Sequence, residues 1–258
     1  MLLPNIPWAG RVWGLPFLTA LAPSERYASH RQKRHRKLTD WGRQCLLQAA
    51  RWLPDRKIIA VADSSFAAID LLRAVWQRMC MITRLRLDAR LFNPPARRRP
   101  GTIGRPRVIG KRPVTLAKRL ADPKTRWRRL QVTGWYGRGE RLVEIVSGIA
   151  LWHHPGRLVP IRYVLVRDAV GELRPQAFLC TDLDANPVDI LRWFVRRWSI
   201  EVTFAEVRRH LGRDPAPSRS DPSRRAQARR RLRGVRPGHR ANHAGAARAV
   251  LPHHFVGA

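Results

Sequence analysis

The sequence predicts an α/β fold in which a mixed sheet is flanked by helices, and three observations carry this prediction. The apolar run at residues 57–62 has the length of a buried strand and ends in Asp63. A helical pattern follows at 66–78, and a long, well-punctuated helical pattern stands at 186–212. This order places Asp63 at the rim of a sheet, where the ligand sites of α/β folds collect. The alternative for a lone aspartate at a strand end is that it only caps the helix that follows.

The other elements are read from hydrophobic period and turn residues. Residues 1–29 mix apolar residues with prolines, which predicts short strands or an extended segment. Residues 39–53 predict an amphipathic helix, and residues 81–92 a further strand. Later strands are expected at 127–136, 142–152, 161–166 and 176–181, separated by glycine-containing turns.

The charge of the chain indicates its class of partner. The formal net charge is +33, from 51 basic and 18 acidic residues, which exceeds what solubility requires. Nucleic acid is the commonest polyanionic partner, and a membrane surface is the alternative. However, no apolar run reaches the roughly 18 residues of a membrane-spanning helix, and the N-terminus has no export signal. Three cysteines without CxxC spacing indicate reduced core thiols of a cytoplasmic protein rather than a zinc site.

Two segments concentrate the basic residues. Residues 30–37 form a run that predicts either a solvated surface or a phosphate-contacting patch. Residues 94–119 are rich in proline, glycine, arginine and lysine, so they can bury little and are predicted to form an exposed basic arm. The candidate DNA contacts of this arm are Arg97, Arg98, Arg99, Arg105, Arg107, Lys111 and Arg112. A disordered linker is the alternative, and it is compatible with the same role.

The helix predicted at 186–212 organises the rest of the interpretation. Asn186 is a favoured N-cap residue, Pro187 suits the first helical position, and Asp189 adds a carboxylate to the first turn. At about 100° per residue, one stripe of this helix is apolar and is predicted to be buried. That stripe contains Leu191, Val195, Trp198 and Val202. The neighbouring stripe contains Phe194, Arg197, Glu201 and Arg208, an arrangement that is also typical of a surface helix with ion pairs.

The spacing of Phe194, Arg197, Glu201 and Arg208 resembles the Y-(2)-R-(3)-E-(6)-K signature of bacterial insertion-sequence transposases in the DDE superfamily. Phe194 lacks the tyrosine hydroxyl of that signature, and Arg208 replaces the lysine but keeps the positive charge. The motif at residues 61–66, Val-Ala-Asp-Ser-Ser-Phe, resembles the second catalytic aspartate motif of the same family.

This resemblance implies a ribonuclease H-like catalytic domain at residues 1–212, with a β-rich insertion at about 94–181. It implies that Asp63 and Glu201 are the second and third catalytic carboxylates, which bind a pair of Mg²⁺ or Mn²⁺ ions, and that Arg197 and Arg208 contact DNA. The substrate implied is DNA at insertion-sequence ends in a bacterial nucleoid, and the intact enzyme can be a homodimer.

The first catalytic aspartate of that family has no counterpart in this sequence. The acids that precede Asp63 are Glu25, Asp40 and Asp55, and none of them ends an apolar run. We therefore expect a chain that begins after that aspartate and has little cleavage activity. Residues 213–258 contain 11 arginines and no lysine, which predicts an unstructured basic tail or a stretch read out of frame after residue 212. A non-catalytic basic nucleic-acid-binding protein is the alternative function.

Overall fold

The computed structural model describes residues 1–97, 101, 103–133 and 139–211 of the 258-residue chain. Two of the candidate DNA contacts, Arg98 and Arg99, and the predicted tail at 213–258 lie outside the described residues. The chain divides into two units, Met1–His210 and Leu211–Ala258. The helices and strands described below belong to the first unit, apart from Leu211 at the end of the last helix.

The described part of the chain contains both helices and strands from start to end. The N-terminal part contains β1 (Asn5–Ile6), a 3-10 turn (Pro7–Ala9), β2 (Arg11–Val12), α1 (Glu25–His30) and α2 (Leu38–Trp52). The middle part contains β3 (Ile59–Val61), a 3-10 turn (Ser64–Phe66), α3 (Ile69–Val75), β4 (Cys80–Leu85), β5 (Leu91–Phe92) and α4 (Leu116–Ala121). The last part contains β6 (Arg128–Thr133), β7 (Glu140–His154), β8 (Arg157–Asp168), β9 (Gln176–Cys180), α5 (Pro187–Arg196) and α6 (Trp198–Leu211).

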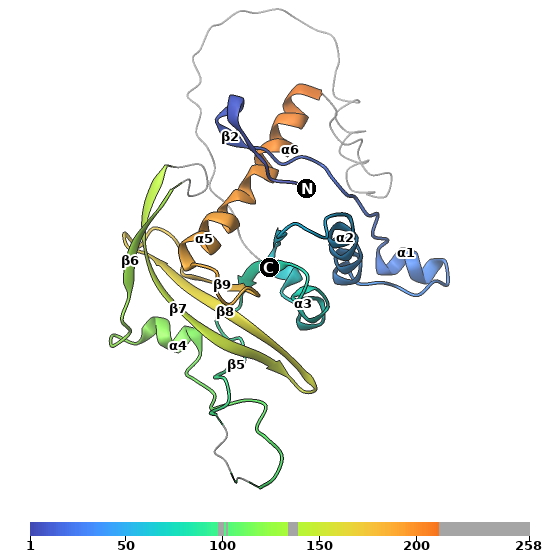
Figure 1. Ribbon diagram of the computed structural model, residues 1–258. Coiled ribbons are helices and arrows are strands. Elements are labelled where there is room, and N and C mark those ends of the chain that lie inside the picture. The colour runs from blue at the N-terminus through green and yellow to red at the C-terminus, as the bar shows by residue number, and fades with distance from the viewer. Residues whose placement is uncertain (98–100, 102, 134–138, 212–258) are drawn as a thin grey trace, which may run out of the picture. The chain divides into compact units, whose positions relative to one another are not determined.

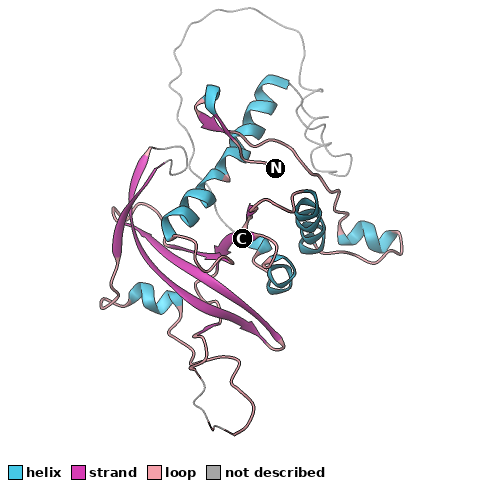
Figure 2. Cartoon of the chain, viewed as in Figure 1, coloured by secondary structure: helices cyan, strands magenta, loops and turns pink. Residues whose placement is uncertain are grey.

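Seven strands form one mixed sheet in the order β3-β4-β9-β8-β7-β5, and β6 also pairs with β7. Strands β3 and β4 are parallel, whereas the remaining pairs in this sheet are antiparallel. Figure 2 shows the long hairpin of β7 and β8, which forms the centre of the antiparallel part. The four later strands predicted from the sequence are therefore confirmed. They extend the sheet that begins with β3 rather than forming a sheet of their own.

Helices cover both faces of this sheet (Figure 1). Helix α3 packs on one face, where Leu72 is buried with Met81 of β4. Helix α5 packs on the other face, where Phe194 is buried with Ile82 of the same strand. Successive residues of a strand point to opposite faces, so one strand contributes to two apolar clusters. The predicted mixed sheet flanked by helices is confirmed.

Several boundaries differ from the prediction for local reasons. The strand predicted at 81–92 is divided into β4 and β5 by a turn, in which the Ala89 N–H donates to the Arg86 carbonyl at 3.1 Å. The helix predicted at 66–78 begins only at Ile69, because Ser64–Phe66 forms a separate 3-10 turn. Strand β3 is half-buried rather than buried, because it is the terminal strand of the sheet.

The basic arm predicted as a loop at 94–119 contains the start of one helix. Helix α4 begins after Thr115, whose hydroxyl accepts a hydrogen bond from the backbone N–H of Lys118 at 3.2 Å. This is an N-cap, and the sequence signal for it was the threonine before a short apolar segment. Leu116 then anchors the helix in the cluster under α3.

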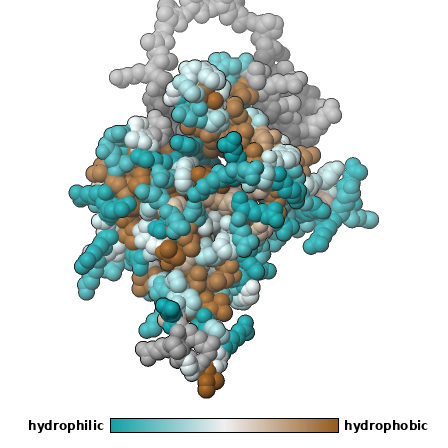
Figure 3. Space-filling model, viewed as in Figure 1, coloured by the Kyte–Doolittle hydropathy of each residue, from teal (hydrophilic) through white to brown (hydrophobic). Residues whose placement is uncertain are grey.

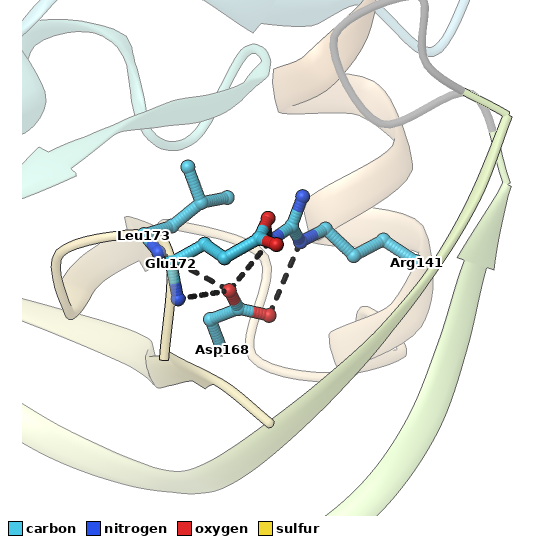
Figure 4. A network of polar contacts seen from close by, with 4 residues as sticks. All are labelled: Arg141, Asp168, Glu172 and Leu173. Carbon is cyan, nitrogen blue, oxygen red and sulfur yellow. Dashed lines mark hydrogen bonds and ion pairs between the residues drawn. The ribbon is translucent and has the colours of Figure 1, made fainter. Parts of the chain in front are cut away.

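A network of ion pairs joins the ends of β7 and β8 (Figure 4). Asp168 is almost fully buried, and its carboxylate binds the guanidinium of Arg141 through two hydrogen bonds of 3.1 and 2.6 Å. The backbone N–H groups of Glu172 and Leu173 donate to the same carboxylate. The bond to Arg141, followed by these backbone donors, lowers the pKa of Asp168 to about 2. A buried acid is thus held ionised by satisfied contacts.

None of the helices among the described residues is long and apolar enough to cross a bilayer.

Candidate active site

Asp63 lies two residues after Val61, the last residue of β3, and its backbone is still extended, with φ −75° and ψ 170°. One carboxylate oxygen accepts a hydrogen bond from the backbone N–H of Ser64 at 2.8 Å, so Asp63 caps the 3-10 turn that follows. The capping role that the sequence left open is therefore present. It uses one of the two carboxylate oxygens, and the residue is exposed, which leaves the group accessible to a ligand.

The alternation of β3 places Asp63 on the face of the sheet that α5 covers. Ile59 and Val61 pack against the cluster around α5, whereas Ala60 and Ala62 pack against the cluster around α3. Because the backbone remains extended through Asp63, its side chain follows the direction of Ile59 and Val61. Asp63 thus lies on the same side as the helix pair that carries Glu201.

The single helix predicted at 186–212 is two helices that meet at Arg197. The predicted start is confirmed, since the Asn186 side chain accepts a hydrogen bond from the backbone N–H of Val188 at 3.0 Å. At the junction, the Arg197 N–H donates to the Phe194 carbonyl at 3.1 Å. The Ile200 N–H donates to the Arg197 carbonyl at 3.0 Å. These bonds span three residues rather than four, which tightens the chain where α5 ends and α6 begins.

Burial along the two helices differs from the predicted stripes. Leu191 and Val195 are buried, as predicted, but Trp198 is 39% exposed. Phe194, which the prediction placed on the polar stripe, is 1% exposed, and its ring lies 4.5 Å from that of Phe178. The apolar face of α5 therefore does not continue into α6. The physical reason is that α5 lies on the sheet, whereas α6 contacts the N-terminal hairpin of β1 and β2.

Glu201 lies in the first turn of α6 beside Arg197. Its carboxylate oxygen is 3.6 Å from the Arg197 guanidinium, and the two side chains are 46% and 21% exposed. A pair at this distance and exposure contributes less than about 1 kcal/mol, so it does not prevent another ligand from binding Glu201. Arg208 is exposed in the last turn, about two helical turns further along α6.

Phe194 connects the surroundings of Asp63 with those of Glu201. Val61 pairs with Ile82 in the parallel register of β3 and β4, so Asp63 is level with Arg84. The guanidinium carbon of Arg84 lies 5.6 Å from the centre of the Phe194 ring. The guanidinium carbon of Arg197 lies 5.7 Å from the same centre. One buried ring therefore contacts two arginines, of which Arg84 is level with Asp63 in the strand register and Arg197 lies 3.6 Å from Glu201.

This arrangement also gives a reason for phenylalanine at position 194. A tyrosine hydroxyl at this buried site would need a hydrogen-bond partner, whereas the phenyl ring needs none. Arg84 was missed in the sequence interpretation. The available signal was a charged residue inside the apolar run of β4, at a position two residues after Ile82 and hence on the α5 face.

Backbone hydrogen bonds join the start of the basic arm, at Asn93, to residues 110 and 111. The Asn93 N–H donates to the Lys111 carbonyl at 3.0 Å, and the Gly110 N–H donates to the Asn93 carbonyl at 2.8 Å. The candidate DNA contacts of the arm that the structure describes are all exposed, and they are Arg97, Arg105, Arg107, Lys111 and Arg112. Their exposure agrees with the predicted arm, and they remain candidates for phosphate contacts.

The described residues do not form a two-metal site. No group of three histidines, cysteines, aspartates or glutamates that could hold a metal ion occurs among them. Asp63 and Glu201 offer the oxygen ligands that Mg²⁺ prefers, but a pair of ions needs further carboxylates. Asp182, the acid that lies shortly before the glutamate helix, pairs instead with Lys57 at 2.8 Å. This contact lowers the pKa of Asp182.

The acids before Asp63 have structural roles away from any strand end. Glu25 is the first residue of α1, and Asp40 accepts a hydrogen bond from the Lys37 N–H at 3.1 Å in a capping box of α2. Asp55 lies in the turn after α2. The described part of the chain therefore supplies two candidate carboxylates, not three.

Comparison with known proteins gives one match. The model of the family described as DDE superfamily endonuclease matches residues 4–141, which include Asp63, Arg84 and the basic arm. No curated protein matches the sequence, and no solved structure does.

Proposed function

Since the chain belongs to the DDE superfamily endonucleases, we propose that it is the catalytic domain of a bacterial insertion-sequence transposase that binds DNA but cleaves it poorly. In this proposal the sheet is the ribonuclease H-like core, Asp63 and Glu201 are the second and third catalytic acids, and the strands β6–β9 are the β-rich insertion. The protein would act on insertion-sequence ends in the bacterial cytoplasm.

One observation carries this proposal. Arg84, Phe194 and Arg197 link the strand end that carries Asp63 to the helix that carries Glu201, on one face of the sheet. The guanidiniums of Arg84 and Arg197 on this face offer positive charge to a DNA phosphate. The arginines can bind the phosphate oxygens through charge-assisted hydrogen bonds, and Arg208 and the basic arm can extend this contact along the backbone.

The weak cleavage follows from the number of acids. Mg²⁺ or Mn²⁺ is the cofactor implied by the family, and such ions activate an attacking oxygen and stabilise a leaving oxygen. Asp63 and Glu201 alone do not suffice for a pair of ions, so the neighbouring arginines would bind a phosphate without its cleavage. Loss of one carboxylate ligand should lower the rate by orders of magnitude.

The test uses the purified chain with Mg²⁺ or Mn²⁺ and duplex DNA that carries the sequences flanking its gene. We expect binding without nicking above background over hours, both for the natural chain and for Glu201→Ala. Asp55→Asn, which changes an acid in a turn, is the matched control. Nicking by the natural chain that disappears in Glu201→Ala and persists in Asp55→Asn would show that the site is complete, against our proposal.

A non-catalytic nucleic-acid-binding protein is the second candidate, and the charge of +33 favours it equally. The two candidates differ in sequence preference. A transposase domain should bind the ends of its own element more tightly than unrelated DNA of the same length, whereas a general binder should not discriminate between them. A competition titration with both duplexes measures this difference.

A further inference from the structure

The N-terminal hairpin presents an exposed tryptophan. Trp8 lies in the 3-10 turn between β1 and β2, and 87% of its surface is exposed. Gly10 closes this turn with φ +62°, a conformation that glycine adopts without strain. A large ring at the tip of a tight turn contributes little to the core and is accessible to a ligand that can stack on it.

The hairpin is fixed to α6, the helix that carries Glu201. The Arg11 guanidinium donates two hydrogen bonds to the Glu206 carboxylate, at 2.8 and 2.9 Å. The Gly14 N–H donates to the Thr203 hydroxyl at 3.1 Å. These contacts lie on both sides of one helical turn, so the hairpin and α6 hold a defined geometry.

A basic groove lies between this hairpin and the helix pair. It has a volume of about 680 Å³ and is lined by residues of the hairpin and of α5 and α6, together with Thr133 and Gly139. Arg11, Arg192 and Arg196 contribute positive charge, Trp198 contributes an aromatic ring, and no carboxylate is among the described lining residues. Arg11 is neutralised by Glu206 and Arg192 is 3.6 Å from Asp189, so Arg196 is the arginine among the described lining residues that is exposed and has no ion pair.

We propose that this groove binds an unpaired strand of DNA, with its phosphates on Arg192 and Arg196 and one base stacked on Trp8. A basic groove combined with exposed aromatic rings is the arrangement that binds single strands, because every base has a face that can stack. A duplex hides those faces, so the ring of Trp8 favours an unpaired segment. The inference rests on the proposed function, since it names the form in which DNA meets the face that carries Glu201.

The test measures binding without catalysis. Fluorescence anisotropy with a labelled 20-nucleotide single strand of arbitrary sequence, and with the corresponding duplex, is carried out in EDTA. Trp8→Ala should weaken single-strand binding about tenfold and leave duplex binding unchanged, whereas Trp8→Phe should retain most of the affinity. Trp52→Ala is the matched control, because Trp52 is 52% exposed at the end of α2. A thermal melt of each variant confirms folding.

A second variant tests the groove independently of the tip. Arg196→Gln should weaken single-strand binding and reduce its salt slope by about one phosphate contact. The inference would be overturned if Trp8→Ala weakened single-strand and duplex binding equally, or weakened neither. It would also be overturned if Trp8→Ala changed only the self-association of the protein. This measurement requires neither a metal ion nor DNA that carries the ends of the insertion sequence. Its result therefore does not depend on whether the chain cleaves DNA or prefers those ends.

Discussion

At the scale of single residues, the most informative contacts are arginine–carboxylate pairs that differ in burial. Glu201 and Arg197 form an open pair at 3.6 Å, whereas Asp168 and Arg141 form a buried, bidentate pair at 2.6 Å for the shorter contact. The first leaves its carboxylate accessible and contributes little energy. The second is fully satisfied and fixes the ends of two strands. Arginine–carboxylate pairs thus belong to a candidate site in one place and stabilise the fold in another.

The Asp168 pair predicts a pH-dependent stability. Folding lowers the pKa of Asp168 from 3.8 to about 2, with Arg141 as the main cause. The ionised form is therefore favoured by the folded state, and its contribution of about 2 kcal/mol is complete above the unfolded pKa and is lost as the pH falls toward 2. Asp168→Asn should lower the free energy of unfolding by about this amount at pH 7, and the difference from the natural chain should shrink between pH 4 and pH 2.

Urea unfolding at several pH values measures this, and Glu172→Gln is the control. Glu172 binds the same arginine at 2.7 Å, but its side chain is 65% exposed, so its loss should change stability by less than about 0.5 kcal/mol. A pH-independent difference between Asp168→Asn and the natural chain would show that the variant acts through packing and not through ionisation.

At the scale of elements, the contact of the hairpin with α6 depends on one glycine. A Cβ atom on Gly14 would lie 3.0 Å from the Ile200 Cα atom and 3.2 Å from the Thr203 hydroxyl oxygen. Because the nearest atom belongs to backbone, the hairpin itself must shift. We expect Gly14→Ala to destabilise the protein by about 1–3 kcal/mol and to expose the Val12–Trp13 segment to limited proteolysis. Leu21→Ala, at a residue that is 88% exposed, is the control. Unchanged cleavage in Gly14→Ala would show that the hairpin tolerates the extra atom in place.

The elements also show which parts of the fold could be predicted from the sequence. The start of α5 was predictable, because Asn186, Pro187 and the apolar stripe are local signals. The division of the helix at Arg197 was not, because the helical period of the sequence continues through it. That division arises from two tertiary partners, the sheet for α5 and the hairpin for α6, which lie far away in the sequence.

The candidate site shows the same limit. Asp63 and Glu201 were identified from motifs, but their relation through Arg84 depends on the register of β3 with β4, which no local pattern contains. The pairing of Lys57 with Asp182 depends in the same way on the arrangement of β3, β4 and β9. Local chemistry can be predicted along a chain, whereas strand order and register are set by the packing of both sheet faces.

At the scale of the whole molecule, charge and topology make separate contributions. The sheet with helices on both faces positions the two candidate acids, while the arginines are distributed over loops, helices and strand edges. Figure 3 shows hydrophilic and hydrophobic residues intermixed over the visible face. Phosphate contacts can therefore form at many points of the surface, and the exposed arm at 94–119 adds a concentrated set of them.

This distribution predicts a steep salt dependence of DNA binding. Each neutralised phosphate releases counterions, so a chain of net charge +33 that contacts six or more phosphates should lose about 10³-fold in affinity between 50 and 200 mM salt. Replacing Arg97, Arg105 and Arg107 by alanine should lower the magnitude of the slope of log K against log salt by up to about 3 if the arm contacts the DNA phosphate backbone.

The control replaces the exposed residues Arg73, Arg78 and Arg90, which removes the same charge elsewhere on the surface. This control should lower the magnitude of the slope much less. Filter-binding titrations at four salt concentrations distinguish the two sets of variants. If the two triple variants have equal slopes, the effect is due to total charge and not to the arm. If the affinity of the natural chain for DNA does not change with salt, the chain does not bind DNA through phosphates.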